Sequence, residues 1–173
     1  MSRYVRVIIN FMDKVDKILK QWERERPDLE VAPMETIGRI NRLNQYVMRR
    51  MEETWSLHGL TPAGFDVLAT LRRSGEPYSL SPGDLLSSTM VTSGTMTHRV
   101  DQLEKAGLVE RRRNPEDGRG FLICLTSKGY QVIDEAVTDH VATQEKLVAR
   151  MSTKQRALLN ELLRQLLQEF EPN

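Results

Sequence analysis

Apolar positions in the first third of the chain recur at the three- and four-residue steps of an amphipathic helix. One stripe occupies residues 5–22 and stops before Pro27, which predicts a long N-terminal helix. Its apolar positions are Val5, Ile8, Met12, Val15, Leu19 and Trp22. A second stripe predicts a helix over residues 34–57. The positions expected to face inward in that helix are Ile37, Ile40, Leu43, Val47, Met51 and Trp55.

Two copies of one helix-starting device follow. Thr61 and Ser81 can each cap a helix, and each precedes a proline, whose missing N–H costs nothing at the first helical position. We therefore expect helices over residues 61–73 and 82–87. The second is short and leads into a polar segment.

A polar-faced helix and a β-hairpin come next. Ser93 or Thr92 can cap the helix, and Gly107 can end it by adopting a left-handed conformation. The β-prone segments 108–113 and 121–125 flank a charged turn that contains proline and glycine. This pattern predicts a hairpin of two strands with a charged tip.

Two further helices close the chain. Thr126 can open a long helix, and the segment from Ser152 to Gln155 has the pattern of a capping box for a last helix. The apolar stripe of that last helix consists of Leu158, Leu159, Leu162, Leu163, Leu166, Leu167 and Phe170. This stripe is wider than one neighbouring helix requires, which suggests a dimer interface.

The outward face of the helix before the hairpin is rich in polar groups that can hydrogen-bond to base edges. The candidate DNA contacts on it are Ser93, Thr95, Thr97 and His98. Three helices followed by a hairpin make a winged helix-turn-helix, in which the hairpin is the wing. The expected fold class is therefore mainly α with a small β-hairpin wing and dimerisation helices at both ends.

The expected organisation has three segments within one compact domain. Residues 1–58 form N-terminal helices, residues 59–126 form the DNA-binding unit and residues 127–173 form C-terminal dimerisation helices. A length of 173 residues, with 39% apolar and 28% charged residues, is ordinary for one globular domain. No apolar run is long enough to span a membrane and no signal peptide is evident, so we expect a cytoplasmic protein.

A formal net charge of +1 excludes a protein that coats nucleic acid indiscriminately. The single Cys124 excludes a disulfide framework and a cysteine-based metal cluster, and its apolar neighbours favour a strand residue over a redox sensor. His58, His98 and His140 lie in different elements without a nucleophile motif, a phosphate loop or paired metal ligands. We therefore expect no enzymatic activity, no metal and no cofactor. A winged helix used only for protein contacts stays open.

The segment LEKAGLVERRRNPEDGRGFLICLTSKG, with its turn triplet Asp117-Gly118-Arg119, resembles the recognition-helix end and wing of the MarR family of repressors. The resemblance extends over residues 34–170. It implies a homodimer that binds a pseudo-palindromic operator, with half-sites about one DNA turn (~34 Å) apart. It also implies release of the DNA when a small ligand binds, often a phenolic or aromatic acid.

The same resemblance assigns a role to the arginines of the wing. The family's arginine at the position of Arg119 reaches into the DNA minor groove, where narrow A·T tracts attract it. Arg112 and Arg113 are candidate backbone contacts, although strand alternation directs one of them away from the DNA.

A urate-responsive subgroup of the family is similar to this chain in having an extra N-terminal helix with a tryptophan. The positions that match its ligand site are Trp22, Asp66, Arg99 and Arg111. An indole can stack on a flat purine anion, guanidinium groups can hold it, and a carboxylate can accept its N–H bonds. The alternative is a core tryptophan and arginines in structural ion pairs, and other purines or aromatic acids stay open as ligands.

Overall fold

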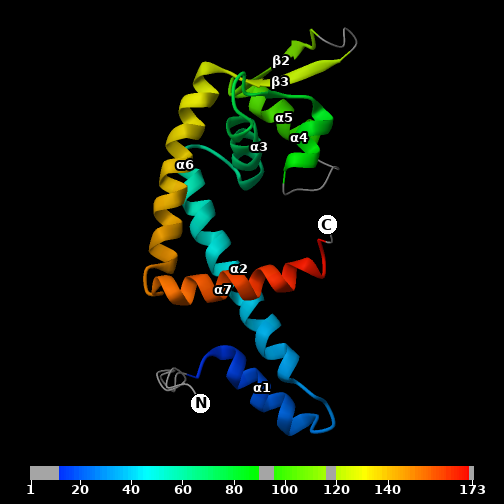
Figure 1. Cartoon of the computed structure of the whole chain (residues 1–173), viewed down its shortest axis with the longest axis vertical. Helices are drawn as coiled ribbons and strands as arrows, with labels where there is room; N and C mark the ends of the chain where they lie inside the picture. Colours follow the sequence, from blue (N-terminus) through cyan, green and yellow to red (C-terminus); the bar gives the residue numbers. More distant parts are fainter. Residues whose placement is uncertain (1–11, 90–95, 116–119, 172–173) are drawn as a thin grey trace. The chain divides into compact units, whose positions relative to one another are not determined.

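The computed structural model describes residues 12–89, 96–115 and 120–171. These residues form seven helices and one small antiparallel sheet, which confirms the mainly α fold class (Figure 1). The chain divides into two compact units, residues 1–49 and 50–173, and the boundary falls within helix α2 (Ala32–Ser56).

In the first unit, helix α1 (Lys14–Glu25) begins at Asp13, whose carboxylate accepts hydrogen bonds from the backbone N–H groups of Val15 and Asp16. Arg39 of α2 donates to Asp13 at 2.9 Å and to Asp16 at 2.6 Å. Val15 is buried beside Gly38, where a Cβ would lie 3.1 Å from the valine Cγ1. These contacts dock α1 on the first half of α2.

Two expectations for the N-terminal helices are wrong. The predicted start of the first helix is wrong, because Asp13 is extended and caps a helix that begins at Lys14; residues before Met12 lie outside the described ranges. Within α2, Met51 and Trp55 are buried as expected, but three positions expected to face inward are exposed. They are Ile37, Leu43 and Val47.

The second unit contains the three helices expected before the hairpin. Helix α3 (Pro62–Arg73) is capped by Thr61 and helix α4 (Pro82–Ser88) by Ser81, as the sequence predicts. Helix α5 (Met96–Lys105) packs against α3, and both lie beside the sheet (Figure 1). The largest fully buried side chains described in this unit are Val67, Leu68, Thr70, Leu71, Leu85, Val100, Val109, Ile123 and Ile133.

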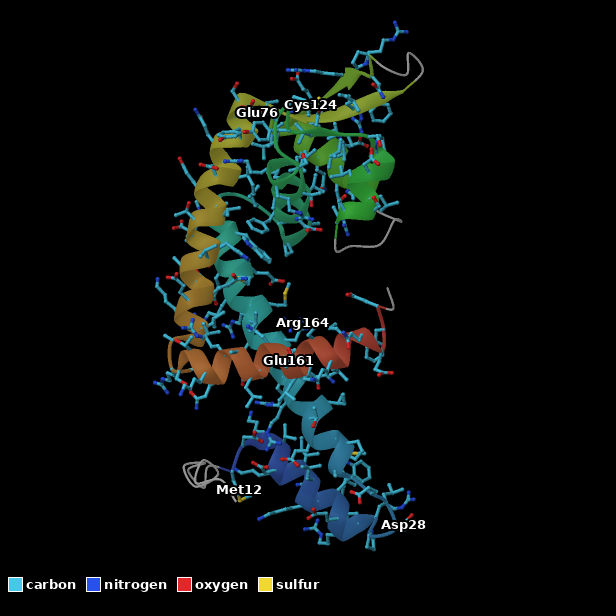
Figure 2. The ribbon with its side chains drawn as sticks, viewed as in Figure 1. Met12, Asp28, Glu76, Cys124, Glu161 and Arg164 are labelled. Atoms are coloured by element: carbon cyan, nitrogen blue, oxygen red, sulfur yellow. The ribbon has the colours of Figure 1, made fainter. Side chains whose placement is uncertain are left out.

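The sheet has one strand more than expected. Strands β2 (Val109–Arg113) and β3 (Phe121–Leu125) form the predicted hairpin, and β1 (Ser79–Leu80) pairs with the other edge of β3, giving the order β1-β3-β2. A strand of two residues has no alternation that a sequence pattern could reveal. Cys124 lies in the central strand (Figure 2), and burial raises the pKa of its thiol.

Helix α6 (Ser127–Val148) starts at a tight joint with the end of α5. Thr126 Oγ1 caps α6 and also donates to the Gly107 carbonyl at 2.7 Å, while Lys128 Nζ donates to the Ala106 carbonyl at 2.9 Å. A Cβ on Gly129 would lie only 1.9 Å from the Leu108 carbonyl oxygen. The start of α6 and the segment that ends α5 are therefore in direct backbone contact.

Helix α7 (Thr153–Gln168) begins with the predicted capping box of Ser152 and Gln155. No residue of α7 is buried, and its apolar stripe is exposed along its whole length. On its polar side, Arg164 donates to Glu161 at 2.5 Å (Figure 2). In the ranges that the structure covers, no helix has the length and apolar character needed to cross a membrane.

Candidate nucleic-acid and ligand sites

The outward face of α5 is the candidate DNA-contacting surface. Met96, Val100 and Leu103 bury one side of the helix, whereas Thr97 and His98 are exposed, as expected. Ser93 and Thr95 lie outside the described residues. The sequence analysis missed two further exposed polar residues, Gln102 and Lys105, which follow His98 by four and seven positions and so continue its face.

His98 and Gln102 are joined by a hydrogen bond. The distance from Gln102 Nε2 to His98 Nε2 is 3.0 Å, and both side chains are exposed. Lys105, one turn further on, has no ion pair among the described residues. The free face of the helix therefore presents a joined polar pair followed by a cation.

The sheet register separates the arginines of the wing onto two faces. Arg111 opposes Ile123 and Arg113 opposes Phe121, so these arginines share the face that packs toward α5, while Arg112 points to the other face and pairs with Glu110. Arg113 is exposed on the α5 side, and Arg112 is exposed on the other face. Arg119 lies outside the described residues.

Arg111 links the wing to α5. Its guanidinium donates to Asp101 at 2.5 Å and also to Glu104, and its backbone N–H donates to Glu104 Oε1 at 3.1 Å. The guanidinium also lies 5.5 Å from the centroid of the Phe121 ring. The hydrogen bond to Asp101 is the main cause that raises the pKa of Arg111. In this state the guanidinium is engaged in structural ion pairs.

Asp66 of α3 and Arg99 of α5 each carry one unsatisfied polar atom, and Asp66 is not among the residues that line the cavity beside Arg99. Asp66 Oδ2 and Arg99 Nη1 are both shielded from solvent and make no hydrogen bond in the described part of the chain. Leaving a buried polar atom unpaired costs about 1–3 kcal/mol, more for a charged group. Asp66 Oδ2 can therefore accept a further hydrogen bond, and Arg99 Nη1 can donate one.

Arg99 also lines a cavity of about 110 Å³ between the start of α3 and α5. The other lining residues are Gly59, Leu60, Thr61, Gly64, Gln102, Leu103, Ala106 and Leu108. Arg111 contacts Asp101 and Glu104, which lie on the opposite flank of α5. No contact joins the two arginines in the described structure. Trp22, 42% exposed, belongs to the other compact unit.

The other two histidines make structural contacts. His58 Nε2 lies 2.9 Å from the Asp139 carboxylate, and His140 Nδ1 accepts a hydrogen bond from Trp55 Nε1 at 3.2 Å. Among the described residues, no group of three histidine, cysteine or acidic side chains could hold a metal ion. These contacts favour structural roles for both rings.

Comparison with known proteins shows the family to which the chain belongs. A model of the MarR family matches residues 58–120. The HTH-type transcriptional regulator PecS of Dickeya dadantii is 37% identical over 150 residues, which cover 87% of this chain and 90% of that protein. The multiple antibiotic resistance protein MarR of Escherichia coli is 32% identical over 106 residues, covering 61% of this chain and 70% of that one.

Solved structures agree. A mutant of E. coli MarR in complex with operator DNA has a TM-score of 0.68 at 28% identity and covers 79% of this chain and 95% of that one. Sco3205 of Streptomyces coelicolor, a MarR family regulator in complex with DNA, has a similar fold: the TM-score is 0.74 at 22% identity, with coverage of 84% and 91%. The chain belongs to the MarR family of transcriptional regulators and is not an enzyme.

Proposed function

We propose that this chain is a repressor that binds an inverted-repeat operator as a homodimer and is released by a small purine or aromatic anion such as urate. The observation that carries the DNA-binding part is the exposed polar face of α5, whose opposite face is core. A helix held in this way can enter the major groove, while Arg113 of the wing can contact the DNA backbone. The mutant of E. coli MarR, which has a similar fold, was solved in complex with operator DNA.

The homodimer is supported by the apolar surface of α7. Leu158, Leu162 and Phe170 are 62%, 54% and 74% exposed, and the rest of the stripe is exposed as well. A continuous apolar face of this kind is stabilised by covering it with a second copy, and a two-fold axis would place two α5 helices on one side of the dimer.

The ligand part is supported by the unsatisfied atoms. A purine anion offers N–H groups that Asp66 Oδ2 can accept and oxygen atoms to which Arg99 Nη1 can donate. Arg111 would join the site by exchanging Asp101 and Glu104 for the ligand. Trp22 is exposed and belongs to the other compact unit, and its part in the site is proposed from the resemblance alone.

DNA binding is tested with duplex from immediately upstream of the chain's own gene and a random duplex of equal length. We expect a dimer that prefers the upstream duplex and whose affinity falls steeply with salt. A protein that stays monomeric at micromolar concentration and shifts neither duplex would contradict the proposal. Such a protein would fit a winged helix used for protein contacts.

The ligand is tested in a Trp55→Phe background, in which Trp22 is the remaining indole. We expect urate to quench Trp22 fluorescence and to release the operator, and Asp66→Asn to blunt both effects while DNA affinity is largely kept. Arg111→Ala separates the two roles of that arginine: a weaker urate response supports exchange onto the ligand, whereas an unchanged response leaves Arg111 as a structural link.

The ion pairs of Arg111 favour a second candidate function, because they engage one of the four residues expected to bind the ligand. The chain would then be a DNA-binding regulator that does not respond to a ligand. An operator complex that is equally stable with and without purines and aromatic acids would support it.

A further inference from the structure

The hydrogen bond between His98 and Gln102 fixes which atoms face outward. Gln102 Nε2 is an amide nitrogen and only donates, so His98 Nε2, 3.0 Å away, accepts. A neutral imidazole carries one proton, which must then lie on Nδ1. The pair therefore presents an N–H donor on His98 and a carbonyl acceptor, Oε1, on Gln102.

The neighbouring side chains of α5 leave this pair as the main polar group on the free face. Asp101 and Glu104 are engaged by Arg111, and Arg99 is half-buried, whereas Gln102, which lines the same cavity as Arg99, is exposed. Of the described residues on α5, Thr97 and Lys105 are the other exposed polar ones.

We propose that Gln102 is a specificity-determining residue that acts together with His98 as one base-contacting pair. This inference rests on the proposed operator binding. The His98 Nδ1–H selects a base with a major-groove acceptor, such as the N7 and O6 of guanine. The Gln102 Oε1 selects an amino group, which adenine N6 or cytosine N4 provides.

The spacing assigns the two residues to different base pairs. Four residues of helix rise about 6 Å, which exceeds the ~3.4 Å rise of one base pair. Because Gln102 sets the tautomer of His98, the two base preferences are coupled. Removing Gln102 lets the imidazole turn either a donor or an acceptor to the DNA, so selectivity relaxes at both positions.

The test is competitive selection from an operator library randomised across each half-site, at one fixed pH of about 8. We compare wild type with His98→Ala, Gln102→Ala, the double variant and Gln102→Glu. Each single variant should lose roughly 5- to 10-fold discrimination at two positions of each half-site, and the double variant should lose less than the product of the two.

Gln102→Glu gives the sharpest outcome. A carboxylate only accepts, so it draws the imidazole proton to Nε2 and leaves an acceptor at Nδ1. The preference at the His98 position should then change from an acceptor-bearing base toward an amino-bearing one. Lys105→Gln is the matched control on the same face: it should weaken binding to all sequences alike and leave the base preferences unchanged.

Melting temperatures report whether the variants fold, and both side chains are exposed, so we expect no change. If wild type selects a sequence but Gln102→Ala and Gln102→Glu select the same one, the paired role of Gln102 is wrong while operator binding stands. If wild type selects no sequence at all, operator binding itself fails and this inference falls with it.

Discussion

His140 packs against two aromatic rings, so its protonation should affect the stability of the fold. Its ring centroid lies 4.8 Å from that of Phe65 and 5.8 Å from that of Trp55, and Trp55 Nε1 donates to its Nδ1. Burial lowers the pKa of His140 from its ordinary value of 6.5. A protonated ring could not accept the Trp55 hydrogen bond.

The free energy of unfolding should therefore fall as the pH drops from about 7 to 5, because the unfolded chain then binds the proton that the folded chain resists. The loss is about 1.4 kcal/mol for each unit by which burial lowers the pKa. His140→Gln does not titrate and keeps an acceptor for Trp55, so it should flatten this dependence in urea unfolding. His58→Gln, outside the stack, should leave the fall in place. Equal slopes for wild type and His140→Gln would contradict the assignment.

Individual residues were predictable where their partners are near in sequence. Thr61, Ser81 and Ser152 cap helices as expected, because an N-cap bonds to a backbone group three residues away. The ion pairs of Arg111 join a strand to a helix seven and ten residues back, and no local pattern reveals that geometry. The unsatisfied atoms of Asp66 and Arg99 likewise become visible only after packing.

At the scale of elements, the starts of α3, α4, α6 and α7 and both strands of the hairpin followed from local signals. Two features could not be predicted from local signals. The two-residue strand β1 exists only through its pairing with β3, and half of the apolar positions expected to face inward on α2 are exposed. Amphipathic periodicity predicts that a face will be covered but does not say by what.

Among the described glycines, Gly129 at the joint between α5 and α6 leaves the least room for a side chain. Gly129→Ala would place its Cβ 1.9 Å from the Leu108 carbonyl oxygen, so backbone has to move. We expect a loss of about 2–4 kcal/mol in the free energy of unfolding, measured with urea.

Gly83→Ala is the matched control for the joint. It is also a helical glycine near an N-terminus, but the nearest atom to its added Cβ is 3.8 Å away, so the change should be neutral or stabilising by up to ~1 kcal/mol. Equal stability of the two variants would show that the joint can open without cost.

At the scale of the whole molecule, the exposed stripe of α7 should decide the oligomeric state. Leu162→Glu places a charge in the middle of that stripe, and Asn160→Glu places the same charge on the same helix outside it. Sedimentation equilibrium should show a monomer for the first and a dimer for the second. Operator affinity should fall by on the order of 10²-fold or more for the first, because each half-site then binds alone. A dimer that survives Leu162→Glu would move the interface elsewhere.

The backbone contact at Gly129 has a mechanical consequence in such a dimer. Helix α6 has 22 residues and is therefore about 33 Å long. Because its first turn is fixed to the end of α5, a tilt of α6 by about 6° around its far end carries α5 by ~3.4 Å, the rise of one base pair. A small rotation of α6 about its far end is thus enough to shift each α5 helix away from its half-site.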